Sequence, residues 1–491
     1  MLLAFGPFRL DRRTYVLSRG DLMVPLSPKL VQVLACLAEA RGELVTRQLL
    51  LDRFWPDVNV TDNTLTRAVA DIRKALGDDP GAATYIQTMA RRGYRFVAPV
   101  AEEAAAAEAT PPGVVPTSDA VAGLEPFVAW ERGRSALESL SVAALPAAAE
   151  AFSRAVAGAP HYAPGYAGLA NAHVFRYEAT RVDNVPDGAA LTAAIAAASR
   201  ATAIDPTLGE GWAALGHALA GAGRLEDARA ALRQAVALEP RNWRHHYRMA
   251  VGTWGEERLR AVERAEALLP GFPGAQTLAA MVLIARQSFD FAHRAAARGA
   301  AAQATQHDRS LYPANGLLWV RGLTATALGQ PAGALDDFRA EAAYSGQATT
   351  VYARECGVLA HEAMGFLLLT LADHDAAAAA FAAAAAASPG HGRAALGAAL
   401  ARGDADPVAA VAGACEAMAG AGKHGERTVL LAAAHGWGGH ADEGLGIAEQ
   451  ALTGASPDST GWSLPADPIF APLRAAGGYA RLAARLASRA A

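Results

Sequence analysis

The stretch DNTLTRAVADIRKAL, residues 62–76, is the most informative segment of this sequence. Its apolar residues recur at the three- and four-residue spacing that places them on one face of a helix. These residues are Leu65, Val69, Ile72 and Leu76. The pattern predicts an amphipathic helix with one face in a core and the opposite face exposed.

The exposed face of this predicted helix carries small and long polar side chains: Asn63, Thr66, Arg67, Ala70, Asp71, Arg73 and Lys74. A helix in the major groove of DNA presents such side chains to base edges and phosphates. Arg67 could read guanine, Asn63 could pair with adenine or a phosphate, and Ala70 leaves room for a thymine methyl group. Asp71 departs from a purely basic face and could accept a hydrogen bond from cytosine or repel poor sites. Any exposed amphipathic helix carries charges, so a merely solvated face stays open as the alternative.

The sequence on both sides of this helix predicts the rest of a small domain. Before it we expect short strands and two helices, the second of which begins at Thr46 and buries Leu49, Leu50 and Phe54. After it, two strands flank a glycine-containing turn, as in a β-hairpin. The strands are predicted over Leu2–Leu10, Tyr15–Ser18, Met23–Leu26, Tyr85–Met89 and Tyr94–Val97, and the first helix begins at Ser27-Pro28. This order of elements predicts an α+β winged helix-turn-helix over residues 1–99.

The predicted hairpin is strongly basic. Arg91, Arg92 and Arg95 crowd one tight turn, where their mutual repulsion is unfavourable unless phosphates share the site. An arginine at the tip of such a wing suits a narrow minor groove. We therefore expect these arginines to contact DNA, with a solvated turn as the alternative.

Several short motifs in this region occur together in one known family. In chain order they are LSPK (26–29), TRQLL (46–50), FWP (54–56), DNTLTRAV (62–69), IRKALGD (72–78), IQT (86–88) and RGYRF (92–96). They resemble the OmpR/PhoB-type winged-helix effector domain, in the CadC-like variety that carries this domain at the N-terminus. The resemblance covers about residues 1–99.

The resemblance implies how such a domain would bind. The third helix would enter the major groove and the hairpin the minor groove, with two copies on directly repeated half-sites. Phosphate contacts would come from Thr46 and Arg47, and from Arg73 or Lys74. The loop 55–60 corresponds to the region that in this family can touch RNA polymerase. No receiver domain precedes the winged helix here and no membrane span follows it, so we expect control to act through the rest of the chain.

The remainder of the chain is rich in alanine and helical patterns. Residues 100–123 are Ala/Glu-rich and then Pro-rich, which is typical of a linker. Further on, Trp212, Leu215-Gly216, Leu219, Gly223, Ala228, Leu232, Ala235 and Pro240 follow the pattern of a tetratricopeptide repeat, whose period is about 34 residues. Looser copies occur on both sides, so residues 124–491 are predicted to form an all-α tetratricopeptide-like solenoid. The tail 467–474 is expected to cap it, and the alanine tract 376–387 to be a packed helix.

Repeat arrays of this kind bind partners on the concave face formed by the first helix of each repeat. By register, Asn171, His217 and Tyr247 point to that face. They are candidates for contact with a protein, a peptide or a small molecule. A single polar residue on that face is more often merely solvated.

The charge distribution, the cysteines and the hydrophobic pattern of the chain limit the kinds of protein it can be. Residues 1–100 carry 14 Lys and Arg against 10 Asp and Glu, whereas the remainder carries 30 against 38. This asymmetry suggests two different tasks, and the acidic solenoid could mask the basic winged helix until a partner engages it. Three cysteines, far apart, form neither a disulfide framework nor a zinc site. The sequence lacks the pattern of a signal peptide and of a spanning helix, so we expect a cytoplasmic protein.

Motifs for catalysis are absent from the sequence. Lys423 follows Gly422 but lacks the earlier Gly and the following Ser or Thr of a phosphate-binding loop. His361-Glu362 lacks the second His of a metalloprotease helix, and the neighbours His245 and His246 would point in different directions on a helix. We therefore expect no catalytic residues, no metal and no cofactor.

Two functions fit these observations. The first is a sequence-specific DNA-binding transcriptional regulator whose repeat domain senses a partner or ligand or self-associates. The alternative is a non-catalytic protein-interaction scaffold in which the winged helix does not bind DNA.

Overall fold

The computed structural model describes residues 2–11, 16–20, 22–24, 26, 28–54, 62–79, 81–89, 92–103, 125–305, 315–452 and 459–491. The chain divides into two compact units, Met1–Glu131 and Arg132–Ala491. Each unit is described by itself below.

The first unit opens with an antiparallel sheet in the order β4-β3-β2-β1-β8. Its strands are β1 Leu2–Phe5, β2 Phe8–Asp11, β3 Val16–Arg19, β4 Leu22–Met23 and β8 Ala101–Glu103. Leu3 lies opposite Leu10, and Leu10 opposite Leu17, and all three side chains are buried. The predicted linker therefore starts with a strand, because β8 returns to pair with β1. The Ala-Glu-Glu sequence of β8 has no apolar alternation that would reveal this pairing.

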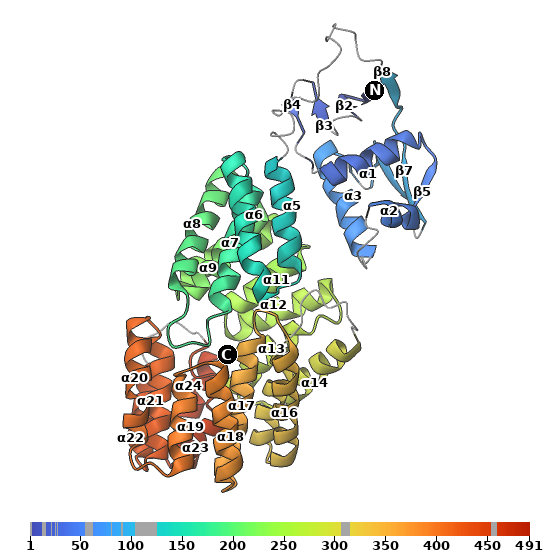
Figure 1. Ribbon diagram of the computed structural model, residues 1–491. Helices are drawn as coiled ribbons and strands as arrows, with labels where there is room; N and C mark the ends of the chain where they lie inside the picture. Colours follow the sequence, from blue (N-terminus) through green and yellow to red (C-terminus); the bar gives the residue numbers. More distant parts are fainter. Residues whose placement is uncertain are drawn as a thin grey trace. The chain divides into compact units, whose positions relative to one another are not determined.

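Three helices and a second sheet follow, as expected for a winged helix-turn-helix (Figure 1). They are α1 Pro28–Glu39, β5 Leu44–Thr46, α2 Arg47–Phe54, α3 Asp62–Leu76, β6 Ile86–Met89 and β7 Gly93–Phe96, with the second sheet in the order β5-β7-β6. The predicted apolar stripe of α3, from Leu65 to Leu76, is buried. Leu50 of α2 is also buried, but the prediction for Leu49 is wrong, since its side chain is 47% exposed. Adjacent residues point about 100° apart on a helix, and in α2 only Leu50 faces the core.

Gly93 fixes how closely the hairpin approaches β5. Its φ is +153°, and a Cβ atom at this position would lie 2.0 Å from the carbonyl oxygen of Val45. Only glycine tolerates that approach. The glycine of the RGY motif is therefore a packing requirement of the second sheet.

The second unit is built from helices (Figure 1). They are α5 Glu125–Glu138, which begins in the first unit, α6 Leu145–Gly158, α7 Ala163–Glu178, α8 Gly188–Ile204, α9 Gly209–Gly221, α10 Leu225–Leu238, α11 Trp243–Gly252, α12 Gly255–Leu268, α13 Gly274–Ala285, α14 Phe289–Thr305, α15 Leu317–Ala327, α16 Pro331–Gln347, α17 Ala353–Thr370, α18 His374–Ala387, α19 Gly392–Arg402, α20 Pro407–Gly420, α21 His424–Trp437, α22 Ala441–Ala451, α23 Ala471–Ala475 and α24 Tyr479–Arg489. From α7 onward they pack in consecutive pairs, and the first helix of each pair also contacts the first helix of the next, from α7 to α21. The predicted all-α solenoid is confirmed.

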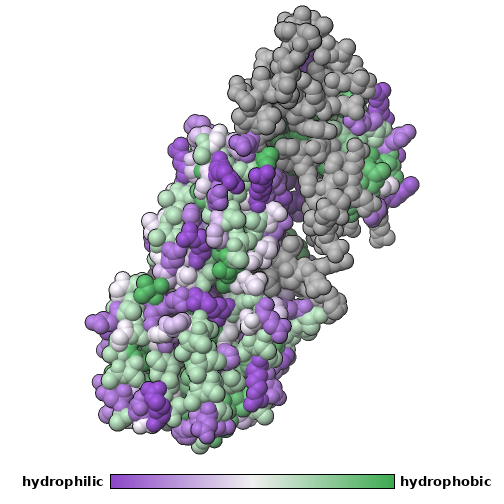
Figure 2. Space-filling view, in the orientation of Figure 1, coloured by the Kyte–Doolittle hydropathy of each residue, from purple (hydrophilic) through white to green (hydrophobic). Residues whose placement is uncertain are grey.

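Small and large residues interlock within these pairs. A Cβ atom on Gly216 of α9 would lie 2.5 Å from Cγ of Leu232 in α10, so the glycine lets the two helices close together. In α18, Phe381 is the one large residue of the alanine tract, and it is fully buried. The tract is thus a packed helix, as predicted. On the face of the second unit that Figure 2 shows, hydrophilic side chains are mixed with mildly hydrophobic ones.

The C-terminal segment does more than cap the array. The turn η2, Pro468–Phe470, packs on α17 and α21, and α24 reaches α13. Trp462 lies edge-on to Trp319 of α15 at 5.7 Å, and Trp437 donates a hydrogen bond of 2.7 Å to the carbonyl oxygen of Ile469. Residues 459–491 therefore cover first helices of several pairs, which is the face that an open array presents to partners.

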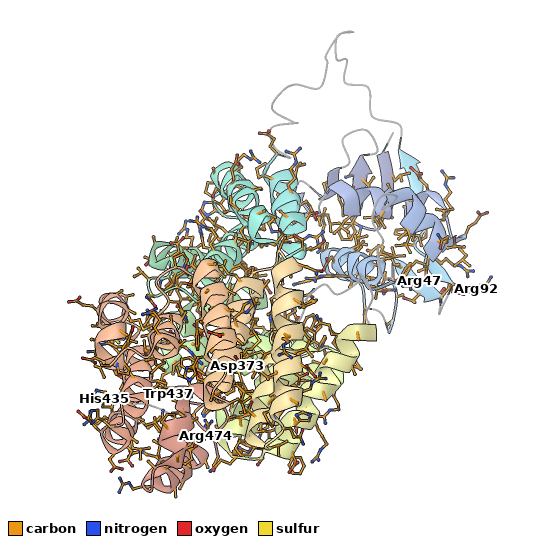
Figure 3. The ribbon with its side chains drawn as sticks, turned by 60° about the horizontal axis from the view of Figure 1, so that its bottom comes forward. Arg47, Arg92, Asp373, His435, Trp437 and Arg474 are labelled. Carbon is orange, nitrogen blue, oxygen red and sulfur yellow. The ribbon has the colours of Figure 1, made fainter. Side chains whose placement is uncertain are left out.

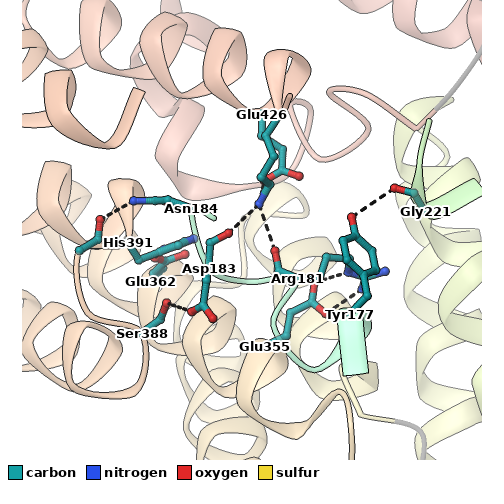
Figure 4. Close-up of polar contacts among 12 residues, drawn as sticks. Tyr177, Arg181, Asp183, Asn184, Gly221, Glu355, Glu362, Ser388, His391 and Glu426 are labelled. Atoms are coloured by element: carbon teal, nitrogen blue, oxygen red, sulfur yellow. Dashed lines mark hydrogen bonds and ion pairs between the residues drawn. The ribbon is translucent and has the colours of Figure 1, made fainter. Parts of the chain in front are cut away.

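The array also closes on itself through the α7–α8 loop (Figure 4). Asp183 in this loop accepts hydrogen bonds from Arg354 at 2.7 and 2.8 Å and from Ser388 at 2.8 Å. Arg181 binds Glu355, and Lys423 donates to the carbonyl oxygens of residues 181 and 183. We call this set of contacts between residues 178–187 and α17–α21 the clasp.

Candidate nucleic-acid interface

The outward face of α3 has the composition that the sequence predicts except at Arg73, whose side chain was expected to be exposed and is buried. Thr66, Arg67, Ala70, Asp71 and Lys74 are exposed, while the apolar stripe of the same helix is buried. Asn63 belongs to α3, but its side chain lies outside the described residues, as does that of Phe54. The helix therefore offers a mixed polar face with Arg67 and Lys74 as its cations.

The beginning of α2 is tied to α3 and to the hairpin. The hydroxyl of Thr46 accepts a hydrogen bond of 3.2 Å from the Leu49 N–H, which is a typical N-cap. The Arg47 guanidinium donates to Thr66 Oγ1 at 3.1 Å and to Tyr94 Oη at 3.5 Å. Arg47 is half-buried, so part of its charge is already held between α3 and β7.

Arg73 and Lys74 are separated by the helix geometry. Arg73 is only 9% exposed, and its guanidinium donates to the carbonyl oxygen of Ile86 at 2.7 Å and to Thr88 Oγ1 at 2.8 Å. Lys74 is exposed. The resemblance implied a phosphate contact from one of the two, and only Lys74 presents its charge to solvent.

The arginines of the hairpin occupy two kinds of position. Arg92 is exposed at the turn, and its carbonyl oxygen accepts a hydrogen bond from the Arg47 N–H; the two residues lie near each other in Figure 3. Arg95 lies in β7, opposite Leu44 and Gln87, and is half-buried. Its neighbours Tyr94 and Phe96 alternate into the core. Arg91 lies outside the described residues.

Asp78 has a structural role in this region that the sequence patterns did not reveal. It lies just after α3, is 6% exposed, and accepts hydrogen bonds from the backbone N–H groups of Thr84, Tyr85 and Ile86 at 2.6, 3.1 and 2.8 Å. The Gly77-Asp78 pair after the helix is the only sequence signal for it, since a polar residue after a helix end commonly caps nearby backbone groups.

The three residues proposed for a partner groove lie on α7, α9 and α11, and each is engaged within the array. Asn171 is buried and donates to Glu210 Oε1 at 2.8 Å, while Arg248 donates to both of them. Burial alone would raise the pKa of Glu210, but the charges of Arg248 and His245 and these hydrogen bonds lower it to about 2.

His217 and Tyr247 pack in the same way. His217 is 6% exposed, with Nε2 3.6 Å from Glu178 Oε1 and its ring edge-on to Phe175. Tyr247 lies edge-on to Phe272, with ring centroids 4.9 Å apart. All three residues lie on first helices of the pairs, but neither Asn171 nor His217 offers an exposed side chain.

Known proteins resemble both units. A family model described as transcriptional regulatory protein, C terminal, matches residues 21–96, and a tetratricopeptide-repeat model matches residues 209–242. Among curated relatives, transcriptional regulator HilA of Salmonella typhimurium is 38% identical over 111 residues, which is 23% of this chain and 19% of HilA. Transcriptional activator CadC of Escherichia coli is 34% identical over 85 residues, 17% of each chain. The likeness thus spans about a fifth of the length of these relatives.

Two solved structures illustrate the likeness of each part. The DNA-binding domain of Klebsiella pneumoniae RstA, in complex with the RstA box, is 26% identical, covers 20% of this chain and 96% of its own, and has a TM-score of 0.18. A tetratricopeptide repeat protein from Parabacteroides merdae is 14% identical, covers 57% of this chain and 99% of its own, and has a TM-score of 0.40.

The family models confirm the resemblance seen in the sequence. The N-terminal part carries an OmpR/PhoB-type transcriptional regulatory domain, and the helical part includes a tetratricopeptide repeat. In the portion of the chain that the structure describes, no helix combines the length and apolarity needed to cross a membrane.

Proposed function

We propose that this chain is a sequence-specific DNA-binding transcriptional regulator. The observation that carries the proposal is the arrangement of α3: one face is buried in the core of a domain of the regulatory type, and the opposite face exposes Arg67 and Lys74. The curated relatives named above are transcriptional regulators, which supports the same reading.

For the binding mode we propose the one that the resemblance to the OmpR/PhoB-type domain implies. The α3 helix lies in the major groove, where Arg67 reads a guanine, Asn63 an adenine or a phosphate, and Ala70 packs against a thymine methyl group. Asp71 accepts a hydrogen bond from cytosine or repels DNA sequences that match poorly. Thr46, Arg47 and Lys74 contact phosphates, and the hairpin places Arg91, Arg92 and Arg95 in the minor groove.

The rest of the chain connects this domain to a signal. Two copies bind directly repeated half-sites, the region 55–60 contacts RNA polymerase, and the repeat unit binds a protein, peptide or small-molecule partner or a second copy of the chain. A regulator acts where the DNA is, so we place the protein in the cytoplasm.

In vitro selection of random duplexes with the full chain tests this function. We expect a recurrent motif that contains a guanine, and Arg67→Ala should relax the preference at that one position by about 1–3 kcal/mol. Lys74→Ala is the matched control on the same face, and it should weaken all sequences about equally. If the full chain enriches no sequence, the domain is a protein-interaction module and the chain a scaffold.

A further inference from the structure

Arg73 connects the end of α3 to the beginning of the wing. Its guanidinium donates to the carbonyl oxygen of Ile86 and to the hydroxyl of Thr88, both in β6. The wing is the hairpin of β6 and β7, in which Ile86 pairs with Phe96 and Met89 with Gly93. A displacement of β6 relative to α3 would therefore displace the whole wing.

Asp78 reinforces the connection from the other side. Its carboxylate accepts three backbone N–H groups, those of residues 84–86, and its own N–H donates to the carbonyl oxygen of Arg73 at 2.9 Å. Both side chains are more than nine-tenths buried. Hydrogen bonds with one ionised partner are about twice as strong as neutral ones, so this connection resists distortion.

The same geometry makes Arg73 a poor candidate for a phosphate contact. The residue is only 9% exposed, and its Nη2 atom already donates to residues 86 and 88, so little of its charge reaches solvent. Lys74, the next residue, is exposed and keeps its charge in solvent. Arg73 therefore binds groups inside the domain, whereas Lys74 faces solvent.

We infer that Arg73 is a positioning residue, which holds the wing at the distance from α3 that lets the helix and the hairpin enter neighbouring grooves of one duplex. This inference rests on the proposed function. A constellation that binds through two separate elements must keep them within about 0.5 Å of the productive geometry, and side chains behind the contact surface usually do this. The connection between Arg73 and β6 is such a support.

The salt dependence of binding separates a positioning role from a phosphate contact. The experiment measures the binding of the full chain to a duplex recovered by in vitro selection, at a series of salt concentrations. The slope of log K against log salt is negative, and Lys74→Met should reduce its magnitude by about 0.9, because one phosphate contact is lost. Arg73→Met should weaken binding but leave that slope as in the unsubstituted chain. A reduction of about 0.9 in the magnitude of the slope for Arg73→Met would overturn the inference.

A double-mutant cycle tests whether Arg73 acts through the wing. In the unsubstituted chain, Arg92→Ala should weaken binding roughly tenfold, since it removes a contact of the hairpin. In the Arg73→Met chain most of that cost should disappear, because the wing is no longer held in place. Equal costs in both chains would mean that Arg73 does not position the wing. A merely structural loss of stability would not change the cost of Arg92→Ala in molecules that remain folded.

Thr88→Val gives a second variant that leaves every charge in place. It removes one acceptor of Arg73 at an exposed position, so the fold should persist even if Arg73→Met unfolds the domain. As with Arg73→Met, we expect Arg92→Ala to cost less DNA affinity in the Thr88→Val chain than in the unsubstituted chain. The salt slope should not change. An undiminished cost of Arg92→Ala in the Thr88→Val chain contradicts the inference. If the unsubstituted chain binds no duplex in dilute buffer, the proposed function fails and this inference fails with it. If the chain binds duplex DNA but Arg73→Met changes the salt slope as the loss of a phosphate contact would, only this inference is refuted.

Discussion

Arg73 and Lys74 are adjacent, carry the same charge, and differ almost completely in exposure. Sequence pattern places both at the end of the polar face of α3. The difference arises from residues 86 and 88, which come from a strand beyond the helix and supply acceptors for one side chain only. Helical periodicity describes a helix by itself, so it cannot identify an acceptor supplied by another element.

The ionised Glu210 side chain should make the stability of the folded chain depend on pH. Its pKa in the folded chain is about 2 against an ordinary value of 4.5, so its contribution to stability is present above about pH 5 and is lost as the pH falls toward 2. Glu210→Gln should reduce the free energy of unfolding at pH 7 by about 1–2 kcal/mol, allowing for solvent screening of a side chain that is a third exposed.

Denaturant unfolding of the full chain at pH 7 and pH 3 measures this effect. The difference between Glu210→Gln and the unsubstituted chain should shrink at pH 3. Glu226→Gln is the control, since the Glu226 side chain is 70% exposed on α10 and its ion pair with Arg229 lies within one helix. A difference that stays constant from pH 7 to pH 3 would show that Glu210 contributes no pH-dependent stability.

The helix α2 is too short for its sequence to identify which of its apolar residues are buried. Leu49 and Leu50 have the same side chain and stand next to each other, but Leu49 is 47% exposed and Leu50 is fully buried. Eight residues make barely two turns, so the apolar residues of α2 do not define a face by themselves. The longer α3 and its stripe of four apolar residues were predicted correctly for the opposite reason.

Substitutions at these two leucines should therefore have unequal effects. We expect Leu50→Ala to destabilise the N-terminal unit by about 2–5 kcal/mol, because it opens a cavity in the core. Leu49→Ala should change stability by less than about 0.5 kcal/mol. Thermal unfolding followed by circular dichroism measures both, and similar losses of stability at the two positions would contradict the packing described here.

At the scale of the whole molecule, the repeat unit differs from the open groove that its sequence suggests. The pairing of helices and the small-to-large packing of Gly216 against Leu232 follow from local spacing, and the sequence reveals them. The clasp joins residues about 170 to 240 positions apart, and residues 459–491 cover the first helices. Contacts at such separation leave no periodic signal, so the closure could not be predicted.

The clasp is mainly polar, with Val182 as a buried apolar residue of the α7–α8 loop. Burial raises the pKa of Asp183, but its hydrogen bonds from Arg354 and Ser388 outweigh this and lower it. A double-mutant cycle of Asp183→Ala and Arg354→Ala should give a coupling energy of roughly 0.5–3 kcal/mol. Either single substitution should speed hydrogen exchange in residues 179–187 and in α17.

Arg339→Ala provides the control for the clasp. The Arg339–Asp336 ion pair is exposed and lies within α16, so its loss should leave exchange in residues 179–187 unchanged. Slow exchange in both the Asp183→Ala and Arg354→Ala chains would mean that other contacts hold the loop.

We propose above that the N-terminal unit binds duplex DNA through α3 and the hairpin. Fluorescence anisotropy of a labelled duplex, titrated with the full chain from dilute buffer to about 0.2 M salt, measures that binding. We predict saturable binding whose log K falls linearly with log salt, with a slope of about −0.9 for each phosphate contacted. The slope should become smaller in magnitude in the Lys74→Met chain. Absence of binding to any duplex in dilute buffer, or binding that does not respond to salt, would contradict the account.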